Sequence, residues 1–269
     1  MKILIRGAGD IATGIALRLY RAGMQVVMTD LPAPTAIRRT VCFSQAIVLG
    51  RTEVEGVAAV LAADAAEAES LLAQEVIPVL ADPECRRRQT LRPDAEVDAI
   101  LAKRNLGTAI TDAPVVIGIG PGFTAGVDCH AVVETMRGHT LGRVIYEGSA
   151  LPNTNIPGLI GGYAGERVLR APADGIFHQL LDIGAEVKAG DVAGEVNGLP
   201  MRCTIDGVVR GILPEGTPVH QGMKSGDVDP RCRPEYCTTA SDKALAVGGG
   251  VLEAILHLSG APYTGAAKL

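Results

Sequence analysis

Two glycine-rich segments could bring backbone amides close to a phosphate group. The first, Gly7-Ala8-Gly9-Asp10-Ile11-Ala12, matches the dinucleotide fingerprint G-x-G-x-x-A. Gly7 allows the tight turn, and Gly9 lets a pyrophosphate approach the backbone. Asp30 follows about 20 residues later, where an acid that binds ribose is expected. This segment therefore predicts a dinucleotide site.

Two residues in and beside this fingerprint are unusual. Arg6 takes a place that is normally apolar, and it could offer charge to a phosphate. Asp10 suits the positive end of the following helix but crowds a bound pyrophosphate. A Rossmann-type fold without a bound dinucleotide is therefore the open alternative.

The second segment is "VVIGIGPGFTAGVD". It lacks the Lys-Ser/Thr ending of an ATPase P-loop. The amides around Gly118, Gly120 and Gly122 could form an anion nest, and Thr124 could donate its hydroxyl. Phe123 is either an exposed platform for a flat heterocycle or a buried residue of a tight connection.

Basic residues could supply counter-charge to an anionic ligand. Lys103, Arg104 and Asn105 follow an apolar segment, where loops at strand ends meet ligands. A solvated turn is the alternative for these three residues. Arg38 and Arg39 form a second basic pair. No set of His, Cys, Asp or Glu residues has convincing metal spacing, so no metal site is predicted.

Cys237 is a candidate reactive thiol near the C-terminus. A thiolate close to Lys243 or to a helix N-terminus would have a lowered pKa and would be reactive at neutral pH. A buried, inert thiol is the alternative. The three glycines before an expected helix over 251–258 predict a close approach of the backbone.

The elements that must position these residues alternate between strand and helix. A strand over 2–5, a helix with an apolar stripe, and a strand over 25–29 surround the first glycine segment. An exposed helix over 64–74 and a strand over 76–80 follow. This alternation predicts an α/β, Rossmann-like, doubly wound parallel sheet.

The C-terminal third changes character after residue 165. The spacing G-x-x-V-x-x-G occurs at Gly184 and again at Gly216, as in the two halves of a biotinyl- or lipoyl-like barrel-sandwich. The segment "VNGLPMRCT" between the halves has no Lys, so we expect a structural or docking module. The predicted domains are a nucleotide- or cofactor-binding domain (1–165), this β-rich module (166–231), and a Cys/Gly-rich loop with a helix (232–269).

Composition limits the partners. The net charge of −5 argues against general nucleic-acid affinity and gives no reason to expect a membrane partner. No apolar stretch could span a bilayer or form a signal-peptide core, so a cytoplasmic protein with reduced cysteines is expected. A homodimer is a reasonable expectation.

Segments from residue 5 to 258 resemble, in order, the YqeB family. They include "RGAGDIATGIALRLYRAG", "TAIRRTV", "ILAKRNLGT", "VIGIGPGFTAGVD", "HAVVETMRGHTLGRVIYEG", "VLRAPADG" and "TTASDKALAVGGGVLEAIL". Members are grouped with selenium-dependent molybdenum hydroxylase systems, in a role similar to the xanthine dehydrogenase accessory proteins. The resemblance implies that the chain binds molybdenum cofactor, as molybdopterin cytosine dinucleotide, for selenium or sulfur insertion or for delivery to an apo-hydroxylase.

Two other functions stay open at this point. The first glycine segment and Asp30 also suit an NAD-dependent oxidoreductase, although no Tyr-x-x-x-Lys pair is evident. The barrel-sandwich module also suits a non-catalytic docking partner of the hydroxylase. The sequence does not decide whether the protein is an enzyme.

Overall fold

The computed structural model describes residues 1–260, which fold into two compact units. The first unit contains residues 1–34, 42–153 and 240–260. The second contains residues 35–41 and 154–239. Each unit is thus assembled from separate stretches of the chain, and the helix predicted at the C-terminus belongs to the first unit. Residues 261–269 of the predicted third region lie outside the described residues.

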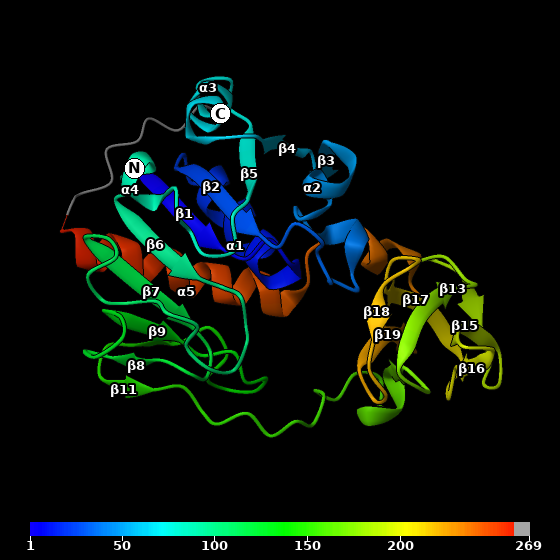
Figure 1. Cartoon of the computed structure of the whole chain (residues 1–269). Helices are drawn as coiled ribbons and strands as arrows, with labels where there is room; N and C mark the ends of the chain where they lie inside the picture. Colours follow the sequence, from blue (N-terminus) through cyan, green and yellow to red (C-terminus); the bar gives the residue numbers. More distant parts are fainter. Residues whose placement is uncertain (261–269) are drawn as a thin grey trace. The chain divides into compact units, whose positions relative to one another are not determined.

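A nine-stranded sheet forms the centre of the first unit (Figure 1). Its strands are β1 (Lys2–Arg6), β2 (Gln25–Asp30), β3 (Arg51–Val54), β4 (Val57–Ala62), β5 (Ile77–Ala81), β6 (Ala95–Asp98), β7 (Val115–Ile119), β9 (Ala131–Val133) and β10 (Val144–Ile145). Their spatial order is β10-β9-β7-β6-β1-β2-β5-β4-β3. All neighbours are parallel except the pairs at the two edges, β3–β4 and β9–β10. The predicted α/β fold with a mainly parallel sheet is confirmed.

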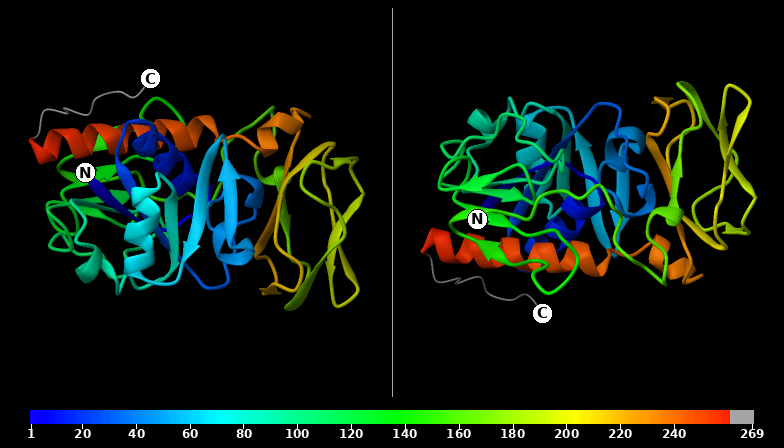
Figure 2. Two further views of the ribbon diagram at one scale, coloured as in Figure 1. Left: turned by 90° about the horizontal axis from the view of Figure 1, so that it is seen from above. Right: turned by 90° about the horizontal axis from the view of Figure 1, so that it is seen from below.

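Helices cover both faces of this sheet (Figure 2). α1 (Asp10–Arg21) and α5 (Asp242–Ser259) pack against each other on one face. α3 (Ala65–Ala73) covers the other face, where Leu4 and Val27 share a core cluster with Ala68 and Leu72. The short helices are α2 (Gln45–Leu49) and α4 (Arg88–Leu91), and the small strands β8 (Thr124–Ala125) and β11 (Gly148–Ser149) form a separate ribbon.

The order of connection reverses at β1. From β1 the chain passes through α1 to β2 on one side, and it later returns to place β6 on the other side. In doubly wound sheets, ligands bind beyond the carboxyl ends of the strands at such a switch point. The loops after β1 and β6 therefore border the expected binding crevice.

The three consecutive glycines lie inside α5, so the prediction that they precede a helix over 251–258 is wrong. A methyl group on Gly248 would lie 3.0 Å from the carbonyl oxygen of Gly14, and one on Gly250 would lie 2.2 Å from that of Gly142. In the other direction, a methyl group on Gly14 of α1 would lie 2.4 Å from Cβ of Ala244. Close packing of α5 thus outweighs the low helix propensity of glycine, about 1 kcal/mol per residue. The predicted close approach of the backbone is confirmed.

The second unit consists of two four-stranded antiparallel sheets around one core. Phe177, Val209 and Val228 are fully buried there. The sheet orders are β12-β19-β17-β14 and β16-β15-β13-β18. Bounds of these strands and of the 3-10 helices are β12 (Val168–Arg170), β13 (Gly175–Gln179), β14 (Glu186–Val187), β15 (Val192–Val196), β16 (Leu199–Arg202), β17 (Gly207–Ile212), β18 (Pro218–Val219), β19 (Lys224–Asp229), η1 (Arg39–Val41), η2 (Gly165–Arg167) and η3 (Pro234–Cys237).

The predicted internal duplication is visible in the strand pairing. β13 pairs with β15 and β18, and β17, the matching strand of the second half, pairs with β19 and β14. Val187 and Val219, the central residues of the two G-x-x-V-x-x-G motifs, both lie in the core. The hairpin between β15 and β16 turns at Asn197 and Gly198, both with positive φ. A two-residue Asn-Gly turn is the favoured hairpin connection, and it carries no lysine to which a swinging arm could be attached.

None of the helices in residues 1–260 is both long and apolar enough to cross a membrane.

Candidate functional site

The first glycine loop leaves β1 and enters α1 as the fingerprint predicts. Gly7 has φ +96°, and a methyl group there would lie 2.9 Å from the carbonyl oxygen of Ala99, so this glycine lets the loops after β1 and β6 pack together. Gly9 precedes α1, and a methyl group there would meet no atom within 4 Å. The loop thus offers open space at Gly9, beside the N-terminus of α1.

Asp30 lies at the end of β2, where the fingerprint predicts a ribose-binding acid. One carboxylate oxygen accepts a hydrogen bond from the amide of Ala8 (2.8 Å), and the other accepts one from the amide of Leu31 (2.7 Å). Burial raises the pKa of Asp30 more than these two amides lower it. The carboxylate therefore fixes the shape of the glycine loop, and a ribose hydroxyl would have to share it.

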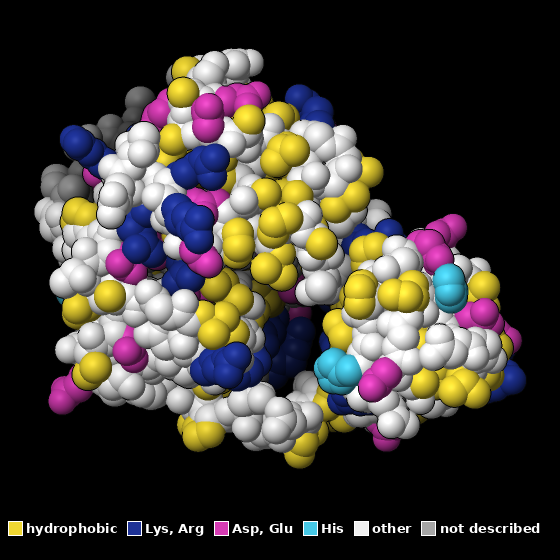
Figure 3. Space-filling model, viewed as in Figure 1, with side chains coloured by type: hydrophobic (Ala, Val, Ile, Leu, Met, Phe, Trp, Pro, Cys, Tyr) yellow, Lys and Arg dark blue, Asp and Glu magenta, His cyan; other side chains and the backbone are white. Residues whose placement is uncertain are grey.

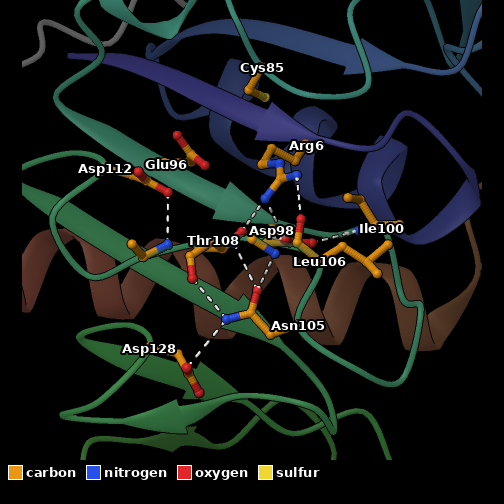
Figure 4. Close-up of polar contacts among 12 residues, drawn as sticks. Arg6, Cys85, Glu96, Asp98, Ile100, Asn105, Leu106, Thr108, Asp112 and Asp128 are labelled. Atoms are coloured by element: carbon orange, nitrogen blue, oxygen red, sulfur yellow. Dashed lines mark hydrogen bonds and ion pairs between the residues drawn. The ribbon is translucent and has the colours of Figure 1, made fainter.

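Arg6 is buried inside the protein instead of offering its charge to a ligand (Figure 4). Its guanidinium forms an ion pair with Asp98 (3.2 Å) and also contacts the hydroxyl of Thr108. Thr108 in turn donates a hydrogen bond to Asp98 (2.6 Å). Arg6 is therefore committed to holding the loop after β6, and the expectation of a phosphate contact is not met.

Asn105 completes this network from within the same loop. Its amide nitrogen donates to the carbonyl oxygen of Thr108 (2.8 Å), and its amide oxygen accepts from the backbone of Gly107 and Thr108. A weaker bond of 3.3 Å reaches Asp128 (Figure 4). Asn105 thus shapes the turn that carries Lys103 and Arg104. Asp98 and Thr108 were not predicted from the sequence, although a polar residue directly after an apolar strand could have indicated Asp98.

Lys103 and Lys243 are two cations of the site whose side chains have no protein partner. Within residues 1–260, neither ammonium group has a hydrogen bond or an ion pair. Lys103 has φ +64°, a backbone conformation that non-glycine residues rarely adopt. Lys and Arg side chains gather at the surface near the loops that follow β6 and β7 (Figure 3).

Desolvation lowers the pKa of Lys103 although its side chain keeps solvent contact. The pKa of Lys243 is lowered first by burial and then by the charges of Lys103 and Arg137, while Asp10 and Glu134 oppose the shift. The two lysines therefore lie close enough to repel each other. Lys243 also occupies the first turn of α5, where the helix dipole disfavours a cation. Such an arrangement destabilises the ligand-free protein and favours the binding of an anion.

Glu134 borders the same group and was missed by the sequence analysis. It follows β9, it is buried, and its carboxylate accepts hydrogen bonds from the amides of Thr135 (2.7 Å), Met136 (2.7 Å) and Leu151 (2.8 Å). Arg137, also missed, forms a two-fold ion pair with Asp242, at 2.7 and 2.9 Å. The signal was again polar residues placed immediately after an apolar strand.

The second glycine loop is filled by protein atoms. A methyl group on Gly118 would lie 2.4 Å from the ring of Phe123. One on Gly120, which has φ +74°, would lie 2.6 Å from the hydroxyl of Thr135, and one on Gly122 would lie 2.7 Å from the backbone of Arg104. These glycines are required by packing, and Gly122 positions the chain next to Lys103.

Phe123 and Thr124 are engaged within the protein. Phe123 is 4 % exposed and lies in a core cluster, so the interpretation as a buried residue of a tight connection is confirmed and that of an exposed platform is wrong. Thr124 shares a hydrogen bond of 2.9 Å with the hydroxyl of Ser149, and its amide donates to Asp128. Small strands and a buried ring thus replace the anion nest that the sequence suggested.

Arg38, Arg39 and Cys237 belong to the second unit. Arg38 donates to the carbonyl oxygens of Tyr236 (3.1 Å) and Thr239 (3.3 Å). Arg39 donates to the carbonyl oxygen of Ile212 (3.0 Å) and to Gln179 (2.8 Å), and burial lowers its pKa. Both arginines hold segments of the second unit together, and the structure does not place them with the first-unit site.

Cys237 is buried, with its sulfur 3.8 Å from the carbonyl oxygen of Val209. Burial raises the pKa of this thiol, and the nearby charges of Arg38 and Arg210 only partly oppose the shift. The reactive-thiol hypothesis required a lowered pKa, so the direction of the shift contradicts it. Cys237 and Lys243, its expected partner, belong to different units.

The residues around Lys103 and Lys243 fit an anionic ligand. Two ammonium groups without partners, an open glycine and a helix N-terminus are suited to a phosphate or pyrophosphate. No group of three or more His, Cys, Asp or Glu residues within residues 1–260 could hold a metal ion. The chemistry that this arrangement supports is charge neutralisation of a bound phosphate.

Comparison with known proteins gives a sequence relative and weak structural likenesses. The chain is 52 % identical over 256 residues to the uncharacterized protein YqeB of Escherichia coli (strain K12), across 95 % of this chain and 47 % of that protein. This chain therefore spans about half the length of the curated relative that it matches. No protein-family model matches the chain.

Two solved structures illustrate the structural likenesses. A succinylglutamate desuccinylase/aspartoacylase from Rhodobacter sphaeroides is 19 % identical, with a TM-score of 0.24 over 51 % of this chain and 58 % of that chain. An aspartoacylase family protein from Mesorhizobium loti is 15 % identical, with a TM-score of 0.25 over 57 % of this chain and 62 % of that chain. Scores this low do not define a shared fold.

Proposed function

We propose that this protein is an accessory protein of selenium-dependent molybdenum hydroxylases, which binds molybdenum cofactor in its dinucleotide form. The cofactor's pyrophosphate would lie at the carboxyl edge of the first unit's sheet, against Gly9, Lys103 and Lys243. The pair of lysines without protein partners carries this proposal. The molybdenum part rests on the resemblance to the YqeB family, and the 52 % identity to Escherichia coli YqeB supports that resemblance alone.

The chain's own residues would act by binding and positioning. Lys103 and Lys243 would neutralise the pyrophosphate, which would relieve their mutual repulsion. Asp30 would hold the glycine loop in shape, and the network of Arg6, Asp98 and Thr108 would hold the loop that presents Lys103. The bound cofactor would supply the molybdenum that receives selenium or sulfur before delivery to the apo-hydroxylase.

An NAD-dependent oxidoreductase is the second candidate. The observation in its favour is that β1, the glycine loop and α1 form as the fingerprint predicts, with Asp30 at the end of β2. Asp30, however, already accepts hydrogen bonds from two backbone amides, including Ala8 of the glycine loop itself. Identifying the bound nucleotide separates the two functions.

The test is to identify the ligand that the protein carries. The full chain is purified without oxygen from cells supplied with molybdate and selenite, and the ligand is released by heat. Chromatography and mass spectrometry identify the nucleotide, and elemental analysis measures molybdenum and selenium in the same sample. A cytidine nucleotide with about one molybdenum per chain is expected. NAD without molybdenum would support the oxidoreductase instead.

A matched pair of variants connects this ligand to the site. Lys103→Ala/Lys243→Ala removes the two lysines that have no partner, and Lys188→Ala/Lys224→Ala removes two exposed lysines of the second unit. Both variants change the net charge equally. Ligand occupancy should fall at least about tenfold in the first variant and stay unchanged in the second. Equal occupancy in both would contradict the assigned site.

A further inference from the structure

The strand β3 is the last strand at one edge of the nine-stranded sheet, next to β4 (Figure 1). Just before β3, the carbonyl oxygen of Gly50 accepts a hydrogen bond of 2.9 Å from the amide of Leu61 in β4. Backbone groups of an antiparallel strand point alternately toward its neighbour and away from it. Those of Thr52 and Val54 therefore also point toward β4.

The backbone groups of the other two residues of β3, Arg51 and Glu53, point away from the sheet by the same alternation. Their side chains are exposed, and they lie on one face because the two residues are two positions apart. Within residues 1–260, neither side chain has a hydrogen bond or an ion pair. An edge with unpaired amides and carbonyl oxygens is a template for a further strand.

Two large apolar side chains lie beside this edge. Val48 is 58 % exposed and Leu49 is 67 % exposed. They end α2, which contacts β3, and Gly50 separates them from the first residue of the strand. A strand added to β3 would therefore lie next to apolar surface that is now in water, and covering such surface favours association.

The charges of β3 fit a second copy of the same strand. Two antiparallel copies pair their outward backbone groups only when a residue of β3 lies on the two-fold axis. With Arg51 or Glu53 on the axis, like charges lie opposite each other, which is unfavourable. With Thr52 on the axis, Arg51 of each copy lies opposite Glu53 of the other, on the same face of the joined sheet. Two attractive charge pairs then flank the axis.

We propose that this protein forms a two-fold dimer in which β3 of one copy pairs antiparallel with β3 of a second copy, with Thr52 on the axis. Arg51 and Glu53 of each copy exchange backbone hydrogen bonds across the interface, and their side chains form the two charge pairs. The exposed apolar end of α2 lies beside the joined strands. This interface is independent of the proposed function, because none of the residues assigned to the ligand lies in β3 or α2.

Sedimentation of the full chain between about 1 and 100 µM measures the dissociation constant of the dimer. Arg51→Glu places two glutamates opposite each other on both sides of the axis, and Glu53→Arg places two arginines there. Each variant should weaken association at least about tenfold. Arg86→Glu and Glu84→Arg are matched controls, because they make the same changes of charge at other exposed side chains, and their dissociation constants should stay within about twofold of the parent's.

An equimolar mixture of Arg51→Glu and Glu53→Arg gives the sharpest result. In the mixed dimer every charge again lies opposite its counterpart, so association should be restored, which a general effect of charge or a loss of folding would not produce. If circular dichroism shows that a single variant does not fold, the double variant Arg51→Glu/Glu53→Arg, which should dimerise as the parent does, decides instead.

Three outcomes would overturn the proposal. A parent protein that stays monomeric up to about 100 µM would leave the edge of β3 to a strand of a different protein. Single variants that dimerise as the parent does would assign the dimer to another surface. A mixture of the two variants that stays monomeric would show that these charges do not lie opposite each other. None of these outcomes would affect the ligand site at Lys103 and Lys243.

Discussion

The two glycine-rich loops of the first unit are alike in sequence and opposite in structure. The loop after β1 leaves open space at Gly9, beside the N-terminus of α1. The loop after β7 has no such space at Gly118, Gly120 or Gly122, because a ring, a hydroxyl and a stretch of backbone already lie there. Glycine spacing therefore predicts that some group approaches the backbone closely. It does not tell whether that group is a ligand or another part of the protein.

The second loop, which follows β7, has a structural role. Gly122 lets the chain pack against the backbone of Arg104, and Gly7 of the first loop packs against the backbone of Ala99. Both contacts fix the segment after β6, which carries Lys103. The second loop thus supports the site, while the first borders it.

The largest expected effect comes from adding a methyl group to the closed loop. Gly122→Ala should destabilise the protein by at least about 2 kcal/mol, because φ is +111° and the added carbon would lie 2.7 Å from the backbone of Arg104. Gly126→Ala is the control, with φ +84° and no atom within 4 Å, and it should cost about 1 kcal/mol. Urea unfolding measures both. Equal losses would show that packing against Arg104 is unimportant.

The same change in the open loop should affect binding and leave stability intact. Gly9 has φ −70° and free space, so alanine fits the protein but would occupy the place where a phosphate approaches. The free energy of unfolding of Gly9→Ala should lie within about 0.5 kcal/mol of the parent's. The variant should bind cytidine diphosphate about tenfold more weakly. If this variant binds cytidine diphosphate with the affinity of the parent, Gly9 does not belong to the binding site.

The pH dependence of ligand binding tests whether the lysines beside the open loop hold the ligand. Binding of an anion requires protonated lysines, and both pKa values are lowered from the ordinary 10.5. Affinity for cytidine diphosphate should therefore decline as pH rises, starting at a lower pH than for an ordinary lysine site. Calorimetry between about pH 7 and 10 follows this decline. A flat profile up to pH 10 would show that these lysines do not hold the ligand.

A small gain in stability is expected when one lysine is removed. The folded-state pKa of Lys243 lies below its unfolded value, so its charged form costs free energy in the folded protein below that pKa, and the cost fades as pH rises toward 10.5. At pH 7, Lys243→Gln should be more stable by about 0.5 kcal/mol, while binding weakens. Thermal unfolding at pH 7 measures the gain, and a loss of stability would show that Lys243 has a structural role.

Local patterns predicted most of the fold. The strand, glycine loop and helix at the N-terminus, the parallel sheet and the duplicated module all follow from periodicity and turn residues. The glycines of α5 were assigned outside a helix, because their packing against Gly14 and Gly142 depends on tertiary contacts.

The candidate site was predicted less completely. Gly9 came from the glycine fingerprint and Lys103 from its place after an apolar segment, whereas Lys243 was predicted only as a partner of Cys237. Arg6 and Phe123 were misplaced because the sequence does not show that Asp98 neutralises the first, or that the space beneath Gly118 accommodates the second. Burial partners decide whether a polar or aromatic side chain is available to a ligand, whether they lie far along the chain, as Asp98 does from Arg6, or near, as Gly118 does to Phe123.

The central claim is that Lys103 and Lys243 hold the phosphate groups of a nucleotide ligand. Titration of cytidine diphosphate at pH 7 into the parent protein, Lys103→Ala/Lys243→Ala and Lys188→Ala/Lys224→Ala tests it most directly. We expect the first double variant to bind at least about tenfold more weakly than the parent, and the second to bind as the parent does. Equal affinities in all three proteins would contradict the claim.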